Sequence, residues 1–256
     1  MVEYGLADIK FVREAPKNQI VVVPAFLSDE ILRDSFLPEY NQVVKEEYGN
    51  NEILRKLDGE GKGSNPFIVG LTRKILADYG VRPVISADDK DGMISEMVRG
   101  KHYTDFGDLV VHSSEETYGR NEKLLKNLIE VVEDKVGSIQ FPFKVTGMIP
   151  ELWEGDNEKG YGLRFVPTEG FDYVPDGRLN LPTGTKFDTI DDKGIINPNE
   201  NGLRTWYSKP DGLSRLYLNR NLDLYSYDGD LDDSNSDGRV VVVDAEGERL
   251  CEGENK

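Results

Sequence analysis

The chain has 256 residues, which allows one large domain or two of roughly 100–150 residues, and 38% of its residues are hydrophobic, a globular composition. Its 48 acidic residues outnumber its 31 lysines and arginines, and the net charge of -17 opposes contact with nucleic-acid phosphates or an anionic membrane. We therefore expect no nucleic-acid partner.

Cysteine usage and apolar runs limit the chain further. Cys251 is the single cysteine, so the chain cannot form an internal disulfide or a multi-cysteine metal site. No stretch approaches the roughly 18 consecutive apolar residues of a membrane span, and the first residues lack a signal-peptide pattern. We expect no membrane insertion. A virion or cell-surface location would need a non-Sec route, lysis or assembly into a particle.

Strand-like and helix-like segments alternate in the first half. Residues 18–23 form a β-branched run, and Ser28 is placed to cap a following helix. The clearest helix is predicted at 65–79, where Asn65 is the cap and Gly80 the stop. A second helix with an apolar stripe is predicted at 121–135, and further strands at 81–86, 108–113 and 138–145.

From Thr146 the texture of the sequence changes. Glycine, proline, asparagine and aspartate become dense, and short β-type runs alternate with turn dipeptides. We predict an α+β protein of two domains: an α/β domain at residues 1–147 and a loop-rich, mostly β domain at 148–256.

The segment from Arg215 to Val243 separates leucines from polar residues. Leucine occupies even positions, namely Leu216, Leu218, Leu222 and Leu224, and an extended chain would bury these on one side. The positions expected to be exposed are all Asn, Asp or Tyr: Tyr217, Asn219, Asn221, Asp223, Tyr225, Tyr227, Asp228, Asp230, Asp232, Asp233, Asn235 and Asp237. From this pattern we expect one contiguous patch, a loop over residues 228–237 and a buried strand at 240–243.

Asn, Asp and Tyr share one codon form, with a variable first base, adenine second and a pyrimidine third. Changing the first adenine of an Asn codon yields Asp or Tyr, so adenine-directed mutagenesis of an Asn-rich template would give this bias. In this respect the segment resembles the variable region of proteins diversified by diversity-generating retroelements. That resemblance covers roughly residues 150–245. It implies a C-terminal C-type-lectin-like (formylglycine-generating-enzyme-like) domain with a constant framework, here Gly212, Leu213, the four leucines, Gly238, Arg239 and Val240 to Val243.

The resemblance implies a non-enzymatic binding protein. Its ligand would be a protein or glycan on another cell or particle, and residues 1–147 would serve attachment or assembly. Tyrosine supplies rigid contact area while Asn and Asp supply adaptable hydrogen bonds, as in antibody paratopes. Trp206 is expected in the core, and Tyr207 either there or on the binding surface.

Calcium binding is the main alternative. Residues 233–244 fit the D-x-[DN]-x-[DN]-G pattern of a calcium loop, with Asp244 at its twelfth position. Against this, the twelfth residue is not Glu, and the segment that enters the loop lacks helical periodicity. A calcium-binding or carbohydrate-active protein with a metal site at residues 233–244 therefore remains the alternative. The first interpretation needs no metal or other cofactor.

Signals for an enzyme are weak. His102 and His112 fall in no known catalytic pattern, and each is expected to be a surface or a satisfied core histidine. The glycine-rich run 59–64 lacks the Lys-Ser/Thr pair and the preceding strand of a phosphate loop, so we interpret it as a flexible linker. Sulfatase-modifying enzymes share the lectin-like scaffold, but their catalytic cysteines have no counterpart here. We predict no enzymatic activity.

Overall fold

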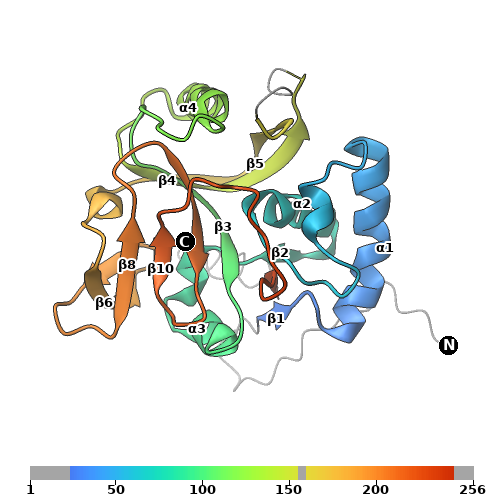
Figure 1. Cartoon of the computed structure of the whole chain (residues 1–256), viewed down its shortest axis with the longest axis horizontal. Helices are drawn as coiled ribbons and strands as arrows, with labels where there is room; N and C mark the ends of the chain where they lie inside the picture. Colours follow the sequence, from blue (N-terminus) through green and yellow to red (C-terminus); the bar gives the residue numbers. More distant parts are fainter. Residues whose placement is uncertain (1–23, 155–159, 245–256) are drawn as a thin grey trace, which may run out of the picture.

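One eight-stranded sheet runs through the computed structural model, which describes residues 24–154 and 160–244 (Figure 1). The strand order is β5-β4-β3-β9-β10-β8-β6-β7, and neighbours are antiparallel except β10 and β8. The strands are β3 (Thr104–Val111), β4 (Phe143–Leu152), β5 (Leu163–Pro175), β6 (Thr185–Ile190), β7 (Ile196–Pro198), β8 (Arg204–Ser208), β9 (Leu213–Leu218) and β10 (Leu224–Ser226). The predicted run at 18–23 and Cys251 lie outside the described residues.

A second, three-stranded sheet joins distant parts of the chain. Its order is β1 (Ala25–Phe26), β11 (Val241–Asp244) and β2 (Val81–Pro83), all antiparallel. Four valines, from Val240 to Val243, are fully buried. The buried strand predicted at the end of the segment 215–243, which we call the display segment, is therefore confirmed.

The α-helices are α1 (Glu30–Glu47), α2 (Pro66–Leu76), α3 (Met93–Val98) and α4 (Glu122–Val136), with short 3-10 turns at Leu54–Lys56, Ala77–Tyr79, Ser86–Asp89 and Gly177–Asn180. In Figure 1, α4 lies along one side of β4 and β5, while α1 and α2 lie at one end of the molecule. No helix in the described ranges has the length and apolar character needed to cross a membrane.

Local signals placed α2 and α4 well, whereas α3 was not predicted and the cap expected for α1 was wrong. The Asn65 side chain accepts a 2.9 Å hydrogen bond from the amide of Ile68, and Gly80 has the left-handed conformation expected of the stop. Helix α4 matches its prediction within a residue at each end. Ser28 is not a cap: α1 begins at Glu30, and the capping position is held by Asp29 without a side-chain cap bond.

Strand predictions were less accurate at their ends. The expected strand at 81–86 stops at Pro83 and gives way to a 3-10 turn, while β3 begins four residues before the prediction. The strand expected at 138–145 begins only at Phe143.

The structure places no domain division at residue 147/148. That position falls inside β4, which pairs with β3 on one side and with β5 on the other. One hydrophobic core contains residues from both sides of it, such as Leu71, Leu109, Phe165 and Val242. The predicted α/β domain is corrected as well, because β3 and β4 flank α4 as an antiparallel pair rather than a parallel β-α-β unit. The chain is a mixed α+β protein.

Candidate functional site

The leucines of the display segment form part of a core, as predicted. Leu216, Leu218, Leu222 and Leu224 are all buried in a cluster that also contains Trp206. Leu218 of β9 pairs directly with Leu224 of β10, so the hairpin points its leucines to the same side.

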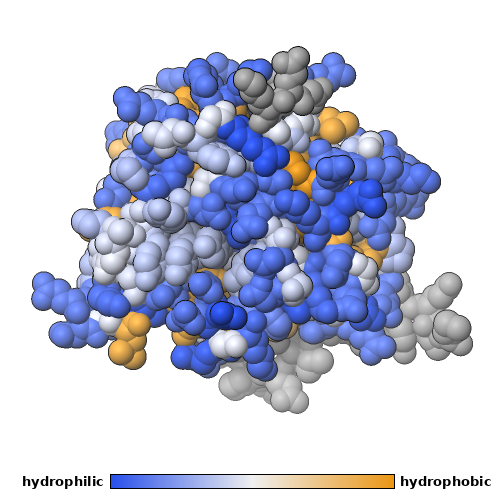
Figure 2. All heavy atoms as spheres, in the orientation of Figure 1, coloured by the Kyte–Doolittle hydropathy of each residue, from blue (hydrophilic) through white to orange (hydrophobic). Residues whose placement is uncertain are grey.

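Tyrosines line the other side of the same strands in a row. Tyr217, Tyr225 and Tyr207 are direct cross-strand neighbours on β9, β10 and β8. Their rings stack nearly parallel, with centroids 5.0 Å apart between Tyr217 and Tyr225 and 4.4 Å apart between Tyr225 and Tyr207. Tyr103 continues the row with an edge contact to Tyr217. All three strand tyrosines are half-buried, and Figure 2 shows a pale area over β8 and β10 amid strongly hydrophilic surface.

A buried ion pair lies under the end of this row. The Arg215 guanidinium is 3.0 Å from the carboxylate of Asp105, and both side chains are essentially inaccessible. Arg215 also lies 4.5 Å from the ring centre of Tyr217, a cation-π contact. Burial raises the pKa of Asp105 to about 6, although the arginine opposes the rise. The pair therefore fixes the position of Tyr217 from below.

The acidic loop, residues 228–237, packs back against the sheet as expected. Leu231 is fully buried, and its amide donates to the hydroxyl of Tyr161. The Asp232 carboxylate accepts hydrogen bonds from Lys56 at 2.9 Å and from Arg120 at 2.6 Å. The Arg215 guanidinium donates to the carbonyl of Asp233. The loop is thus held by side chains from four separate parts of the chain.

The glycine-rich run 59–64 supports the loop, and its interpretation as a flexible linker is wrong. The amide of Ser64 donates to the Ser234 hydroxyl at 3.0 Å, and the amide of Gly63 donates to the Gly238 carbonyl at 3.0 Å. An added Cβ at Gly63 would lie 2.4 Å from a backbone oxygen, so glycine is required for this close packing.

The twelve predicted display residues do not share one environment. Four are exposed, namely Asn221, Tyr227, Asp233 and Asn235, and seven are partly exposed, namely Tyr217, Asn219, Asp223, Tyr225, Asp228, Asp230 and Asp237. Asp232 is only 8% exposed, so its prediction as a surface position is wrong: the carboxylate is needed to pair with two cations. Asp223 also has a structural contact, because its side chain accepts a 2.7 Å hydrogen bond from the backbone amide of Thr205.

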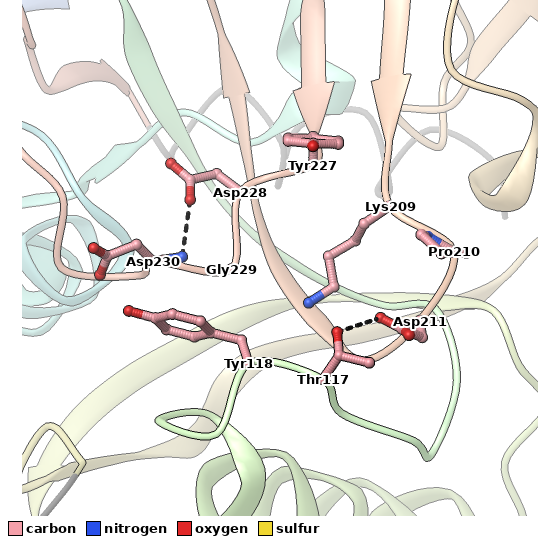
Figure 3. Close-up of a pocket in the computed structure, with 9 residues that line it drawn as sticks. All are labelled: Thr117, Tyr118, Lys209, Pro210, Asp211, Tyr227, Asp228, Gly229 and Asp230. Atoms are coloured by element: carbon pink, nitrogen blue, oxygen red, sulfur yellow. Dashed lines mark hydrogen bonds between the residues drawn. The ribbon is translucent and has the colours of Figure 1, made fainter.

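A hollow of about 420 Å³ lies where the end of β10 meets the loops after β3 and β8 (Figure 3). Lys209 enters it from one side with only 8% of its surface exposed, and its ammonium group donates to the carboxylate of Glu116 and to the carbonyl of Leu213. The lining residues are Thr117, Tyr118, Lys209, Pro210, Asp211, Tyr227, Asp228, Gly229 and Asp230.

The carboxyl group of Asp230, which lines this hollow, has a raised pKa. A hydrogen bond to Asp232, together with burial, raises the pKa of Asp230 to about 6. Arg120 and Asp228 act on the same group in opposite directions, the arginine lowering its pKa and the aspartate raising it.

The histidines have structural environments. His112 is buried, with one ring nitrogen 2.7 Å from Asn180 Oδ1 and the other 3.0 Å from Ser226 Oγ. Ser226 and its neighbour Ser214 are fully buried, so neither hydroxyl is placed to attack a substrate from solvent. His112 is therefore a satisfied core histidine. His102 makes an edge contact with the ring of Phe26.

The segment considered for calcium adopts a different local structure from a calcium-binding helix-loop-helix. Asp244 ends strand β11, where it pairs with Val81, instead of standing at the start of a helix that closes the loop. Among the described residues, no group of three or more His, Cys, Asp or Glu side chains is arranged to hold a metal ion.

Comparison with known proteins adds no relative. No family model matches the chain, and no curated protein or solved structure is significantly similar to it.

Sequence reasoning missed much of this surface. Lys209 and Tyr118 reach the hollow from loops that carry no motif, and Lys56 and Arg120 meet Asp232 across more than 100 residues of chain. The sequence leaves Tyr207 either in the core or on the binding surface, and its register with Tyr225 follows only once β8 and β10 are known to pair.

Proposed function

We propose that the protein is a non-enzymatic binding protein. Its binding face consists of the tyrosine row, the adjacent hairpin turn and the acidic loop, and its ligand is a protein or glycan on another cell or particle. The observation that carries this proposal is the separation within one segment: β9 and β10 point leucines into a core and, at the alternate positions, tyrosines outward.

The physical properties of the face suit recognition. The stacked rings of Tyr217, Tyr225 and Tyr207 are held in place before any ligand arrives, which lowers the entropy lost on binding. The exposed side chains around them, such as Asn221 and Asn235, provide donors and acceptors that can adapt.

Diversification by a retroelement is part of the proposal, and it rests on the Asn, Asp and Tyr composition together with the buried framework. The display unit, with a C-type-lectin-like architecture, would be larger than residues 148–256, because β3 lies beside β9 in the same sheet. Attachment to a virion or cell surface would then fall to surfaces away from the tyrosine row.

The neighbouring DNA tests the diversification directly. We expect an adjacent reverse-transcriptase gene and a near-identical repeat with adenines at the codons of the exposed positions. Related loci should differ at Asn221, Tyr227, Asp233 and Asn235 while keeping the leucine codons. A locus without such a repeat, or with leucine codons that vary equally, would refute this part of the proposal.

A pair of libraries tests the binding face itself. Randomising the four exposed positions should preserve folding in most members, since exposed substitutions usually cost under about 0.5 kcal/mol each. Randomising the four leucines should abolish folding in most members. Selection from the first library should yield binders to unrelated proteins or glycans. Equal folding losses in the two libraries would contradict the proposed separation of framework and display positions.

A further inference from the structure

The hollow beside Tyr227 combines an aromatic wall, a nearly buried lysine and three carboxylates, those of Asp211, Asp228 and Asp230. We propose that it binds a neutral pyranose unit of a glycan directly, without a bridging metal ion. This inference names a ligand class for one part of the proposed binding face, and it rests on that proposal for the role of the face.

Two tyrosine rings are available to contact a ligand. Tyr227 is 61% exposed and Tyr118 is 37% exposed, and both line the hollow. In Figure 3 Tyr227 lies at the end of β10, and Tyr118 lies in the loop below it. The carbon-bound hydrogens of a pyranose form an apolar face that packs on such rings, while the phenol hydroxyl groups remain free to hydrogen-bond.

Lys209 supplies a directed donor. Its ammonium group has three N–H bonds, and among the described residues it donates to Glu116 at 3.1 Å and to the Leu213 carbonyl at 3.0 Å. An added Cβ at Gly229 would lie 3.3 Å from this nitrogen, so glycine leaves the space beside it open. The third N–H is therefore available to a ligand oxygen in the hollow.

Carboxylates supply the acceptors. Asp228 and Asp230 lie along the wall opposite Lys209 in Figure 3, and each belongs to the same loop as Gly229. A sugar hydroxyl both donates and accepts, so neighbouring hydroxyls of one ring satisfy a carboxylate and an ammonium group together.

The lining disfavours anionic and apolar ligands. An anion would meet Asp228, Asp230 and the acidic net charge of the chain. An apolar ligand would remove water from these charges without replacing their hydrogen bonds. The volume of about 420 Å³ lies within the range of small-molecule sites and suits one or two sugar rings.

Saturation-transfer NMR on the full chain tests the inference. The probes are the methyl glycosides of glucose, galactose, mannose and N-acetylglucosamine, each with and without EDTA, and glucuronate and N-acetylarginine amide as charged comparisons. We expect at least one neutral glycoside to bind, with no effect of EDTA. Asp228→Asn and Tyr227→Ala should each weaken that binding by about tenfold or more, because a charged hydrogen bond or a ring contact is lost.

Asp134→Asn is the matched control, since it neutralises an exposed carboxylate on α4, outside both the hollow and the proposed binding face. It should leave the Kd unchanged, and thermal melts should show all three variants folded. The inference is overturned if no neutral glycoside binds, if binding survives both hollow variants or requires calcium, or if only a charged probe binds. If the gene carries the retroelement repeat but the protein binds no sugar, only this inference is refuted. If the protein binds a sugar but its gene lacks the repeat, only the proposed diversification is refuted.

Discussion

Asp232 and Asp233 are neighbouring aspartates with different environments, one buried and hydrogen-bonded and the other exposed. Substituting each by Asn measures how much the hydrogen bonds of Asp232 contribute to stability. Asp232 accepts hydrogen bonds from Lys56 and Arg120, whereas Asp233 exposes its side chain. A hydrogen bond to a charged group contributes roughly 1.5–3 kcal/mol when buried. The Lys56 and Arg120 side chains are 36% and 31% exposed, so both regain water when the carboxylate is lost. We therefore expect Asp232→Asn to cost about 1–2 kcal/mol in total, and Asp233→Asn less than about 0.5 kcal/mol.

Thermal and urea unfolding measure this difference. For a chain of this size, each kcal/mol lowers the Tm by about 2–4 °C, so Asp232→Asn should melt roughly 2–8 °C below the unsubstituted protein. Asp233→Asn should melt within about 2 °C of it. Urea midpoints with unchanged slopes would show that the effect lies in the folded state. Equal melting temperatures for the two variants would refute the structural role assigned to Asp232.

Three further predictions concern stability. Leu218→Ala should cost roughly 2–5 kcal/mol in urea unfolding, against under about 0.5 kcal/mol for the exposed Tyr227→Ala, and similar losses would contradict the framework assignment. Since the pKa of Asp230 is raised to about 6 in the folded state, its stabilising contribution is complete below the ordinary value and is lost as pH rises through 6. Asp230→Asn should therefore stabilise the protein at pH 7.5 but not near pH 4, and a gain that is independent of pH would refute this. Asn65→Ala should cost about 1 kcal/mol by loss of the α2 cap, and an unchanged urea midpoint would show that the cap bond contributes nothing.

Features with local causes were predictable from the sequence. Helix α2 has its cap, its first proline and its stop within 16 residues, and the alternation of leucine and tyrosine in β9 needs only the two-residue period of a strand. The burial of Leu216 and Leu218 and the partial exposure of Tyr217 therefore follow from a short stretch of chain.

Features that depend on distant partners were not predictable. Nothing local distinguishes Asp232 from Asp233, because Lys56 and Arg120 lie far away in sequence. The change of texture near residue 147 suggested a domain boundary, but it reflects a change in loop content while β4 continues across it. The hollow could not be predicted either, since Tyr118, Lys209 and Tyr227 come together only when β3, β8 and β10 assemble.

The three-stranded sheet has a consequence for how the chain is ordered. Ala25 and Val242 are direct neighbours in β1 and β11, so the described fold returns to the place where it begins. A covalent connection between these two strands would close the backbone into a ring, which could be opened in the exposed turn at 199–201. Such a circular permutant would keep every cross-strand pair of the tyrosine row, because the row depends on which strands meet and not on the order in which they are synthesised.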